Sequence, residues 1–326
     1  MSSVRKMTAL WRLKMNPRTR KLIKIIVGNL LLLASVIVGV LLITGVPIDF
    51  DIIYEKGRYR PNMSWEIIME GIRENFRYVF SGKVKDLVIL DGTVGELFAV
   101  SARRSGIVLL FGILLAVLVG IPKGILDSRK RDRIGTFKML QSLVPLSVPD
   151  ILTIGLVQML ALYLFKSGIT FFGIGPIEFK GDQYWYSAIY PIISISILPA
   201  AYIARTTATA IEEGFSKPYI LAARGKGCSR FRIIRNHLMK SVVYEVLSVF
   251  PTILALMFSS LIIVERLFYY RGIGYHMIDF YTSTRIDAFA GSMAFSYFMT
   301  IMAVVYFLIL LMFNVLKDVV IPQVKS

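Results

Sequence analysis

The stretch SKPYILAARGKGCSRFRIIRNHLMK, residues 216–240, lies between two long apolar segments and predicts a short helical hairpin. Pro218 suits the first turn of a helix, because the N–H that proline lacks would have no helical partner there. The residues after it favour a helix until Gly225 and Gly227, which are typical of a helix end.

The second half of this stretch has the pattern of another short helix. Phe231, Ile234 and Leu238 recur at helical spacing and predict one apolar stripe, with the arginines largely elsewhere. Two interpretations remain open from the spacing alone. The segment is either a solvated basic loop that sets the topology or a short amphipathic hairpin that a soluble partner binds.

The composition is that of a membrane protein with several spans. Hydrophobic residues make up 56% of the 326 residues, and charged residues only 18%. The formal charge of +17 would also suit a nucleic-acid-binding protein. The basic residues, however, lie between charge-free stretches too long for soluble core helices, so we expect membrane lipid and no nucleic acid as a partner.

Five stretches are free of charge and close to the length of roughly 20 residues that crosses a bilayer. They are residues 25–48, 105–122, 183–204, 246–264 and 288–316. A sixth stretch, residues 139–165, has the length but carries Asp150 near its middle. Because each span must satisfy its backbone polar groups internally, we expect an all-α protein with six transmembrane helices.

The distribution of basic residues predicts that the N- and C-termini are cytoplasmic. With that orientation, 24 of the 38 Lys and Arg residues face the cytoplasm. Nine of the remaining basic residues lie in the long outer segment, residues 49–104, where nine Asp and Glu residues offset them. This asymmetry is the one that the positive-inside rule describes.

The predicted organisation follows from these stretches, together with an amphipathic helix in the outer segment. The apolar residues of that helix are Trp65, Ile68, Met69, Ile72, Phe76 and Val79. The expected parts are a basic leader (1–24), the first span (25–48), the extracytoplasmic segment (49–104), a core of five spans (105–318) that contains the inner loop 209–240, and a cytoplasmic tail (319–326).

The sequence contains no motif for catalysis or for metal binding. It has no phosphate-binding loop of the G-x-x-x-x-G-K-[ST] type, and hence no visible means of binding ATP by itself. The two histidines, His237 and His276, fall near opposite faces of the membrane in this topology and cannot share a metal. Cys228 has no second cysteine to pair with, and a filler role is favoured over a reactive thiol. We therefore predict no enzyme, no metal and no cofactor.

Asp150 is the one carboxylate placed clearly within a predicted span, and two roles are open for it. An ionisable residue at this depth usually faces an aqueous path or a partner, which would let Asp150 line a translocation path. Alternatively, it caps the helix that restarts after Pro149 by accepting from free backbone N–H groups.

Several stretches resemble the permease subunits of ABC importers, in the oligopeptide/dipeptide/nickel branch. They are ELFAVSARRSGIVLLFGILLAVLVGIPKG (96–124), SVPDILTIGLV (147–157), ILPAAYIARTTATAIEEGFSKPYILAARGKG (197–227) and ERLFYYRGIGYHMID (265–279). They occur in the family's order around the spans. In the motif of the inner loop, Leu221 stands where the family usually has an acidic residue.

The resemblance implies a type I ABC importer permease fold in the plasma membrane of a prokaryote. It implies a second permease subunit that is a different chain, two cytoplasmic ATPase subunits that bind the ATP, and an extracytoplasmic solute-binding protein. The residues implied at the ATPase interface are Ala222, Ala223, Gly227, Cys228 and Ser229. The cargo would be peptides or similar small solutes. The alternative is a stand-alone secondary transporter or channel, and a membrane-embedded enzyme is the third interpretation.

Overall fold

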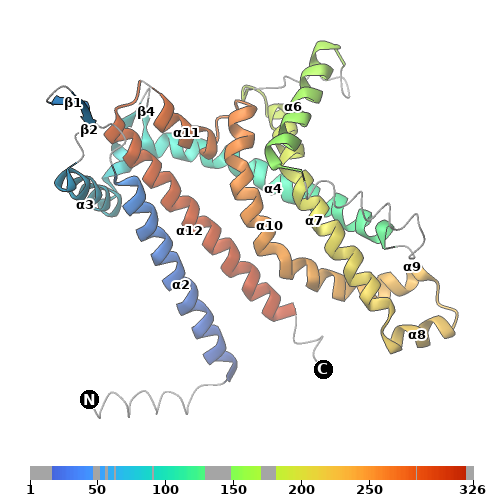
Figure 1. Cartoon of the computed structure of the whole chain (residues 1–326). Helices are drawn as coiled ribbons and strands as arrows, with labels where there is room; N and C mark the ends of the chain where they lie inside the picture. Colours follow the sequence, from blue (N-terminus) through green and yellow to red (C-terminus); the bar gives the residue numbers. More distant parts are fainter. Residues whose placement is uncertain are drawn as a thin grey trace, which may run out of the picture.

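The computed structural model describes residues 17–46, 52–55, 58–61, 64–89, 92–128, 148–169, 181–283 and 285–320. Long helices dominate this part of the chain (Figure 1). Their bounds are α2 Pro17–Thr44, α3 Trp65–Ser81, α4 Val94–Asp127, α6 Asp150–Lys166, α7 Ile189–Phe215, α8 Pro218–Gly225, α9 Arg230–Ile233, α10 Met239–Leu267, α11 Ile273–Thr282 and α12 Ala288–Val320.

Five helical segments of the described residues are long and apolar enough to cross a membrane. They are Ile26–Thr44, Val94–Asp127, Trp185–Phe215, Arg230–Leu267 and Phe289–Asn314. Each contains one of the five charge-free stretches or most of it. The sixth predicted span is represented by α6, which has 17 residues, and the part of that stretch before residue 148 lies outside the described residues.

A stripe of small residues lies at the contact between α4 and α7. Gly112, Ala116, Gly120 and Gly124 repeat every four residues along α4 and are all buried. A Cβ atom on Gly120 or Gly124 would lie within 2.8 Å of an α7 backbone oxygen. Small residues at this spacing let two helix backbones approach closely, which is how membrane helices gain packing energy.

The contacts fix the relative directions of the helices. Gly112 of α4 lies against Ile195 of α7, and Gly124 lies against Ala204, so the two helices run parallel. Ser105 of α4 bonds to Glu265 of α10, whereas Gly112 lies against Met257, so α4 and α10 are antiparallel. These directions are those of spans that alternate across a bilayer.

One end of the molecule is formed by the described residues of the segment 49–104 and the helix ends that they touch. There α3 packs on the end of α2 and near the start of α12, through Asn75, whose amide donates to Thr44 (2.9 Å) and Ser296 (2.9 Å). The start of α2 and the end of α12 therefore point to the other end, where α8 and α9 lie (Figure 1).

The outer segment also departs from the all-α expectation. It contains two small antiparallel pairs, β1 (Ile52–Glu55) with β2 (Arg58–Pro61), and β3 (Val88–Ile89) with β4 (Gly92–Thr93). The helix of the first span ends at Thr44, before residue 48, and a Cβ atom on the next residue, Gly45, would lie 2.7 Å from the Ile72 Cα of α3. The amphipathic helix is confirmed as α3, and Ser64 caps its start.

Candidate functional site

The hairpin predicted from residues 216–240 is present at the end of the molecule opposite α3 (Figure 1). Helix α8 begins at Pro218 and ends at Gly225, as the sequence predicts. Gly227 makes the turn with φ of +79°, a left-handed conformation that favours glycine. The second helix, α9, begins at Arg230.

The predicted apolar stripe of the second helix is wrong in one position. Ile234 and Leu238 are buried, but Phe231 is 71% exposed, and Ile233 is buried in its place. The physical reason is a π-helical turn, Ile234–Leu238, between α9 and α10. Such a turn inserts an extra residue and rotates the preceding face of the helix relative to the following one. Phe231 consequently points to solvent.

The hairpin is fastened to three of the long helices. Ile220 of α8 is fully buried in the main core, and Leu238 packs directly on Gly214 near the end of α7. The Arg230 guanidinium donates to the Ser128 carbonyl at the end of α4 (2.5 Å) and lies 4.5 Å over the Phe215 ring. Side-chain contacts therefore tie the hairpin to α4 and α7, and the chain continues from it into α10.

The residues that the resemblance implies at an ATPase interface lie together on this hairpin. Ala222, Gly227 and Ser229 are exposed, and Ala223 and Cys228 are half-buried. Two large apolar side chains of α8 are exposed beside them, Tyr219 and Leu221, and Phe231 is exposed on α9. Small residues next to exposed apolar ones make a surface that a partner can approach closely.

A buried carboxylate links α4, α10 and α11 on the side of the molecule away from the hairpin. Glu265, in α10, has no exposed surface and accepts from Ser105 Oγ of α4 (2.5 Å) and from the backbone N–H groups of Gly274 (2.7 Å) and Tyr275 (3.2 Å). Ser105 Oγ in turn accepts from Ile273 N (2.8 Å). The carboxylate thus holds the first turn of α11 against α4 and α10, where three donors offset its desolvation.

His276 of α11 lies outside the candidate spans and is itself almost fully buried. Burial lowers the pKa of the His276 imidazole from its usual 6.5 to about 4, while Asp279 acts in the opposite direction. The nearby Arg104 and Arg271 guanidinium groups lower this pKa further, and Asp182 raises it. The imidazole is therefore neutral near pH 7.

This pKa predicts an acid sensitivity. Between pH 6.5 and pH 4 the unfolded chain takes up a proton at His276 that the folded protein does not bind, so stability falls as the pH falls. The loss is about 1.4 kcal/mol per pH unit in that window. We expect His276→Gln to flatten this part of the melting-temperature profile, measured in detergent from pH 7.5 to pH 4.5. An unchanged slope would contradict the assignment.

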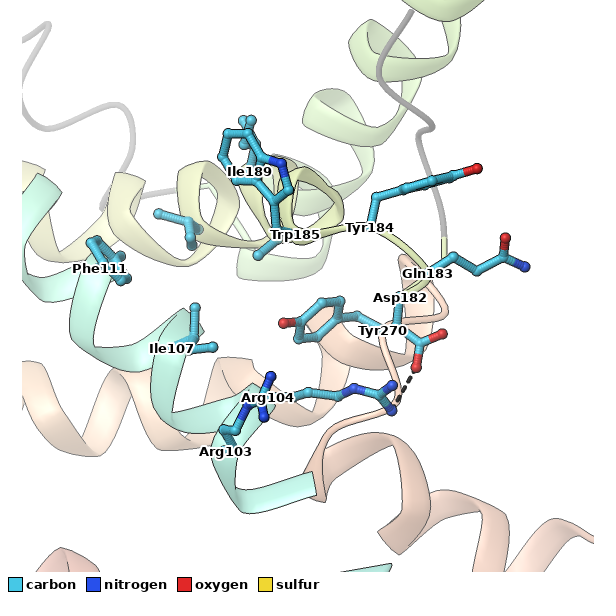
Figure 2. A pocket seen from close by; sticks show the side chains of 12 residues that line it. Arg103, Arg104, Ile107, Phe111, Asp182, Gln183, Tyr184, Trp185, Ile189 and Tyr270 are labelled. Atoms are coloured by element: carbon cyan, nitrogen blue, oxygen red, sulfur yellow. Dashed lines mark ion pairs between the residues drawn. The ribbon is translucent and has the colours of Figure 1, made fainter. Parts of the chain in front are cut away.

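A cavity of about 610 Å³ opens beside this junction, between the start of α4, the start of α7 and the loop after α10 (Figure 2). Its lining includes the apolar side chains of Ile107 and Phe111 and the aromatic residues Tyr184, Trp185 and Tyr270. A volume of this size suits a small ligand or a protein loop.

Arginine side chains give the edge of this cavity its charge. Arg104 pairs with Asp182 (2.6 Å), as the dashed line in Figure 2 marks, and Arg271 approaches the same carboxylate at 3.9 Å. Arg103 also lines the cavity and makes no ion pair within the described part of the chain. Because Asp182 offsets the charge of Arg104, the unpaired charge of Arg103 makes the cavity lining positive.

Asp150 is the first residue of α6, directly after Pro149. Its carboxylate accepts from the Ser260 hydroxyl of α10, and no capping bond from this side chain is found within α6. About two helical turns further along α6, the Gln158 amide donates to the Leu267 carbonyl (2.7 Å). Both contacts join α6 to α10 as parallel helices. Whether Asp150 also lines a path stays a prediction.

Two functional contacts were not predicted from the sequence, the anchor at Arg230 and the junction at Glu265. Glu265 is the first charged residue after the charge-free stretch 246–264 and precedes the glycines at 272 and 274. An acidic residue shortly before a glycine-rich turn that starts a helix can accept hydrogen bonds from the free N–H groups of that helix start. This pattern is the local signal for the contact between Glu265 and α11. No local signal pairs Arg230 with Ser128, because the two are 102 residues apart.

Comparison with known proteins gives one family and several relatives. The family model for the inner membrane component of binding-protein-dependent transport systems matches residues 109–326. A dipeptide transport system permease protein of Bacillus subtilis is 25% identical over 65% of this chain and 65% of its own length. One of Lactococcus lactis subsp. cremoris is 26% identical over 65% of this chain and 66% of its length. A third, of Haemophilus influenzae, is 30% identical over 43% of this chain and 40% of its length. The chain thus spans slightly less than two thirds of the relatives that it matches over the greatest length.

Proposed function

Because this chain belongs to the family of inner membrane components of binding-protein-dependent transport systems, we propose that it is the permease subunit of an ATP-driven importer. In this proposal it forms one side of a translocation path, with six spans and both termini in the cytoplasm. A second permease, a different chain, forms the other side. Two separate ATPase subunits bind the ATP, so the chain is no enzyme and needs no cofactor of its own.

The observation that carries this proposal is the fastened hairpin. An ATPase can drive transport only if it binds a surface of the permease and if that surface is connected to the transmembrane helices. The exposed residues of α8 and α9 supply the surface, and the contacts of Ile220, Leu238 and Arg230 supply the connection to the spans. Ala222, Ala223, Gly227, Cys228 and Ser229 would lie at this interface.

We propose peptides as the cargo, and other small solutes are the second choice. Support comes from the relatives, which are dipeptide transport system permeases. The outer cavity, with its aromatic rings and the Arg103 guanidinium, which pairs with no acid among the described residues, is suited to receive such a molecule from an extracytoplasmic solute-binding protein. The assembled importer would work in the plasma membrane of a prokaryote.

Association with an ATPase tests the proposal. The chain is extracted in mild detergent with its co-expressed partners, and the partners are identified by a phosphate-binding loop in their sequence. We expect Phe231→Asp to lower the ATPase recovered at least tenfold, because a carboxylate would have to be desolvated in the interface. The protein itself should still fold, since Phe231 is 71% exposed.

The matched control is Val88→Asp. Val88 is also 71% exposed but lies in β3, at the end of the molecule away from the hairpin. This variant should keep its ATPase. Equal recovery with Phe231→Asp and Val88→Asp would contradict the proposal. Uptake by vesicles that contain no ATPase would favour a stand-alone secondary transporter instead.

A further inference from the structure

The apolar face of α3 is wider than the part of it that packs on the rest of the chain. Asn75 and Val79 lie on the packed side, Asn75 buried and Val79 against the core cluster next to α11 and α12. Trp65, Met69 and Phe80 lie beside that side and are 74%, 49% and 71% exposed. Within the described part of the chain, packing therefore uses only part of the apolar face of this helix.

The exposed apolar side chains follow one line along the helix. Trp65, Met69, Phe76 and Phe80 come at intervals of four, seven and four residues, so they share one side of α3. The Phe76 and Phe80 rings are stacked, with 6.1 Å between their centroids. These four residues, the α3 stripe, lie about a quarter of a turn round the helix from the packed side.

Charged residues occupy the next side of α3. Glu66, Glu70, Arg73 and Arg77 come at intervals of four, three and four residues, and all four are exposed. They lie about a quarter of a turn beyond the α3 stripe. The two carboxylates offset the two guanidinium groups, so this side carries no net charge. The order around the helix is therefore packed side, apolar stripe, charged side.

The contacts of α3 place it at the level where two candidate spans leave the membrane. The Asn75 amide donates to Thr44, where the first candidate span ends. The Tyr78 ring packs edge-on against the ring of Phe289, where the last candidate span begins, with 6.2 Å between their centroids. Figure 1 shows α3 beside the end of α2. An exposed apolar surface at this level adjoins the boundary between lipid and water.

The α3 stripe also continues an apolar surface of α2. Leu42 and Ile43, in the last turn of α2, are 44% and 76% exposed. They are the neighbours of Thr44, to which α3 is bonded. Because α2 is a candidate span, its exposed apolar side chains face the acyl chains of the bilayer. The lipid surface that covers the end of α2 thus reaches the helix that is packed on it.

We propose that the α3 stripe is inserted into the outer leaflet of the membrane. The axis of α3 lies in the membrane plane, its apolar side chains reach the boundary between headgroups and acyl chains, and its charged side lies among the headgroups. Asn75 joins α3 to Thr44 of α2 and to Ser296 of α12. The inserted helix therefore sets the depth at which the outer ends of these two spans lie. This role needs neither a cargo nor an ATPase.

The accessibility of spin labels on α3 tests the proposal. Cys228 is the only cysteine of the chain, so Cys228→Ser provides a background for single labels. The full-length chain, with the subunits that accompany it, is placed in nanodiscs of phosphatidylcholine. The two relaxing agents are oxygen, which concentrates in lipid, and a water-soluble nickel chelate. We expect labels at Met69→Cys and Phe80→Cys to be relaxed by oxygen and shielded from the nickel chelate.

The matched controls are Arg73→Cys and Arg77→Cys, which carry the label on the charged side of the same helix. These labels should be relaxed by the nickel chelate. Addition of phosphatidylglycerol to the nanodiscs should leave the pattern unchanged, because the charged side has no net charge. A Met69 label that enters the lipid only when this anionic lipid is present would contradict insertion by the apolar stripe.

A charge within the stripe should withdraw the helix from the lipid. We expect Phe80→Asp to abolish the shielding of the Met69 label from nickel, because a carboxylate would have to enter the apolar layer. Ile67→Asp is the control for this change. Ile67 is 39% exposed and lies on the side of α3 opposite the stripe, so the shielding of the label should persist.

Two results of the labelling would overturn the proposal. If the nickel chelate reaches the Met69 and Phe80 labels as readily as the Arg73 and Arg77 labels, then the stripe lies in water. If neither agent reaches the Met69 and Phe80 labels, then a protein covers the stripe, either the second permease or the solute-binding protein. Neither result bears on the permease assignment, which is tested by the recovery of the ATPase.

Discussion

Replacement of Gly124 by valine is expected to destabilise the protein by about 3 kcal/mol, the upper end of the usual cost of overpacking. A Cβ atom at this position would lie 2.5 Å from the Ala204 carbonyl oxygen and 2.5 Å from Thr207 Cβ. Both neighbours belong to α7 and cannot turn away, so α4 must separate from α7. The melting temperature in detergent should fall by roughly 4–5 °C.

The same substitution at Gly106 is the matched control for Gly124→Val. Gly106 is in α4 as well, but a Cβ atom there would meet nothing within 4 Å. Gly106→Val should melt within about 2 °C of the unmodified protein, because a single exposed helix position changes stability by less than about 1 kcal/mol. Equal melting temperatures for the two valine variants would show that the small-residue stripe does not set the helix contact.

Replacement of Arg230 by glutamine is expected to lower uptake at least tenfold while ATP hydrolysis by the complex persists. The variant loses two charge-assisted hydrogen bonds to Ser128 and the contact of the guanidinium with the Phe215 ring. The exposed residues Leu221 and Phe231 are untouched, so the ATPase should still bind the hairpin. Its motion would then no longer reach α4.

Uptake and ATP hydrolysis are measured on the same reconstituted complex. Arg232→Gln serves as the control, because Arg232 is exposed two residues further along the hairpin and makes no contact with Ser128. It should retain uptake. If Arg230→Gln and Arg232→Gln transport equally well, then the bond between the hairpin and α4 does not carry the coupling.

The parts of the structure that could be predicted from the sequence are those with local signals. Charge-free runs indicate where helices cross a membrane, and a proline followed by glycines brackets the hairpin helix α8. A further local signal lay at the start of α4. Thr93 and Glu96 form a capping box and begin the helix eleven residues before the charge-free stretch at 105.

The parts that could not be predicted depend on residues far apart in the chain. The direction in which Phe231 points is decided by the π-helical turn after it, and no residue type marks that turn reliably. The partners of Glu265 come from α4 and from the start of α11, so only the packed helices bring them together.

Helix α4 is tied at two places, to Arg230 at its end through Ser128 and to Glu265 through Ser105, about a third of the way along its length. Its 34 residues form one helix of about 51 Å, with Pro122 near the end that Arg230 holds. In the proposed importer, a displacement of the hairpin would pull on α4, and the bond from Ser105 to Glu265 would carry it to the start of α11 beside the outer cavity.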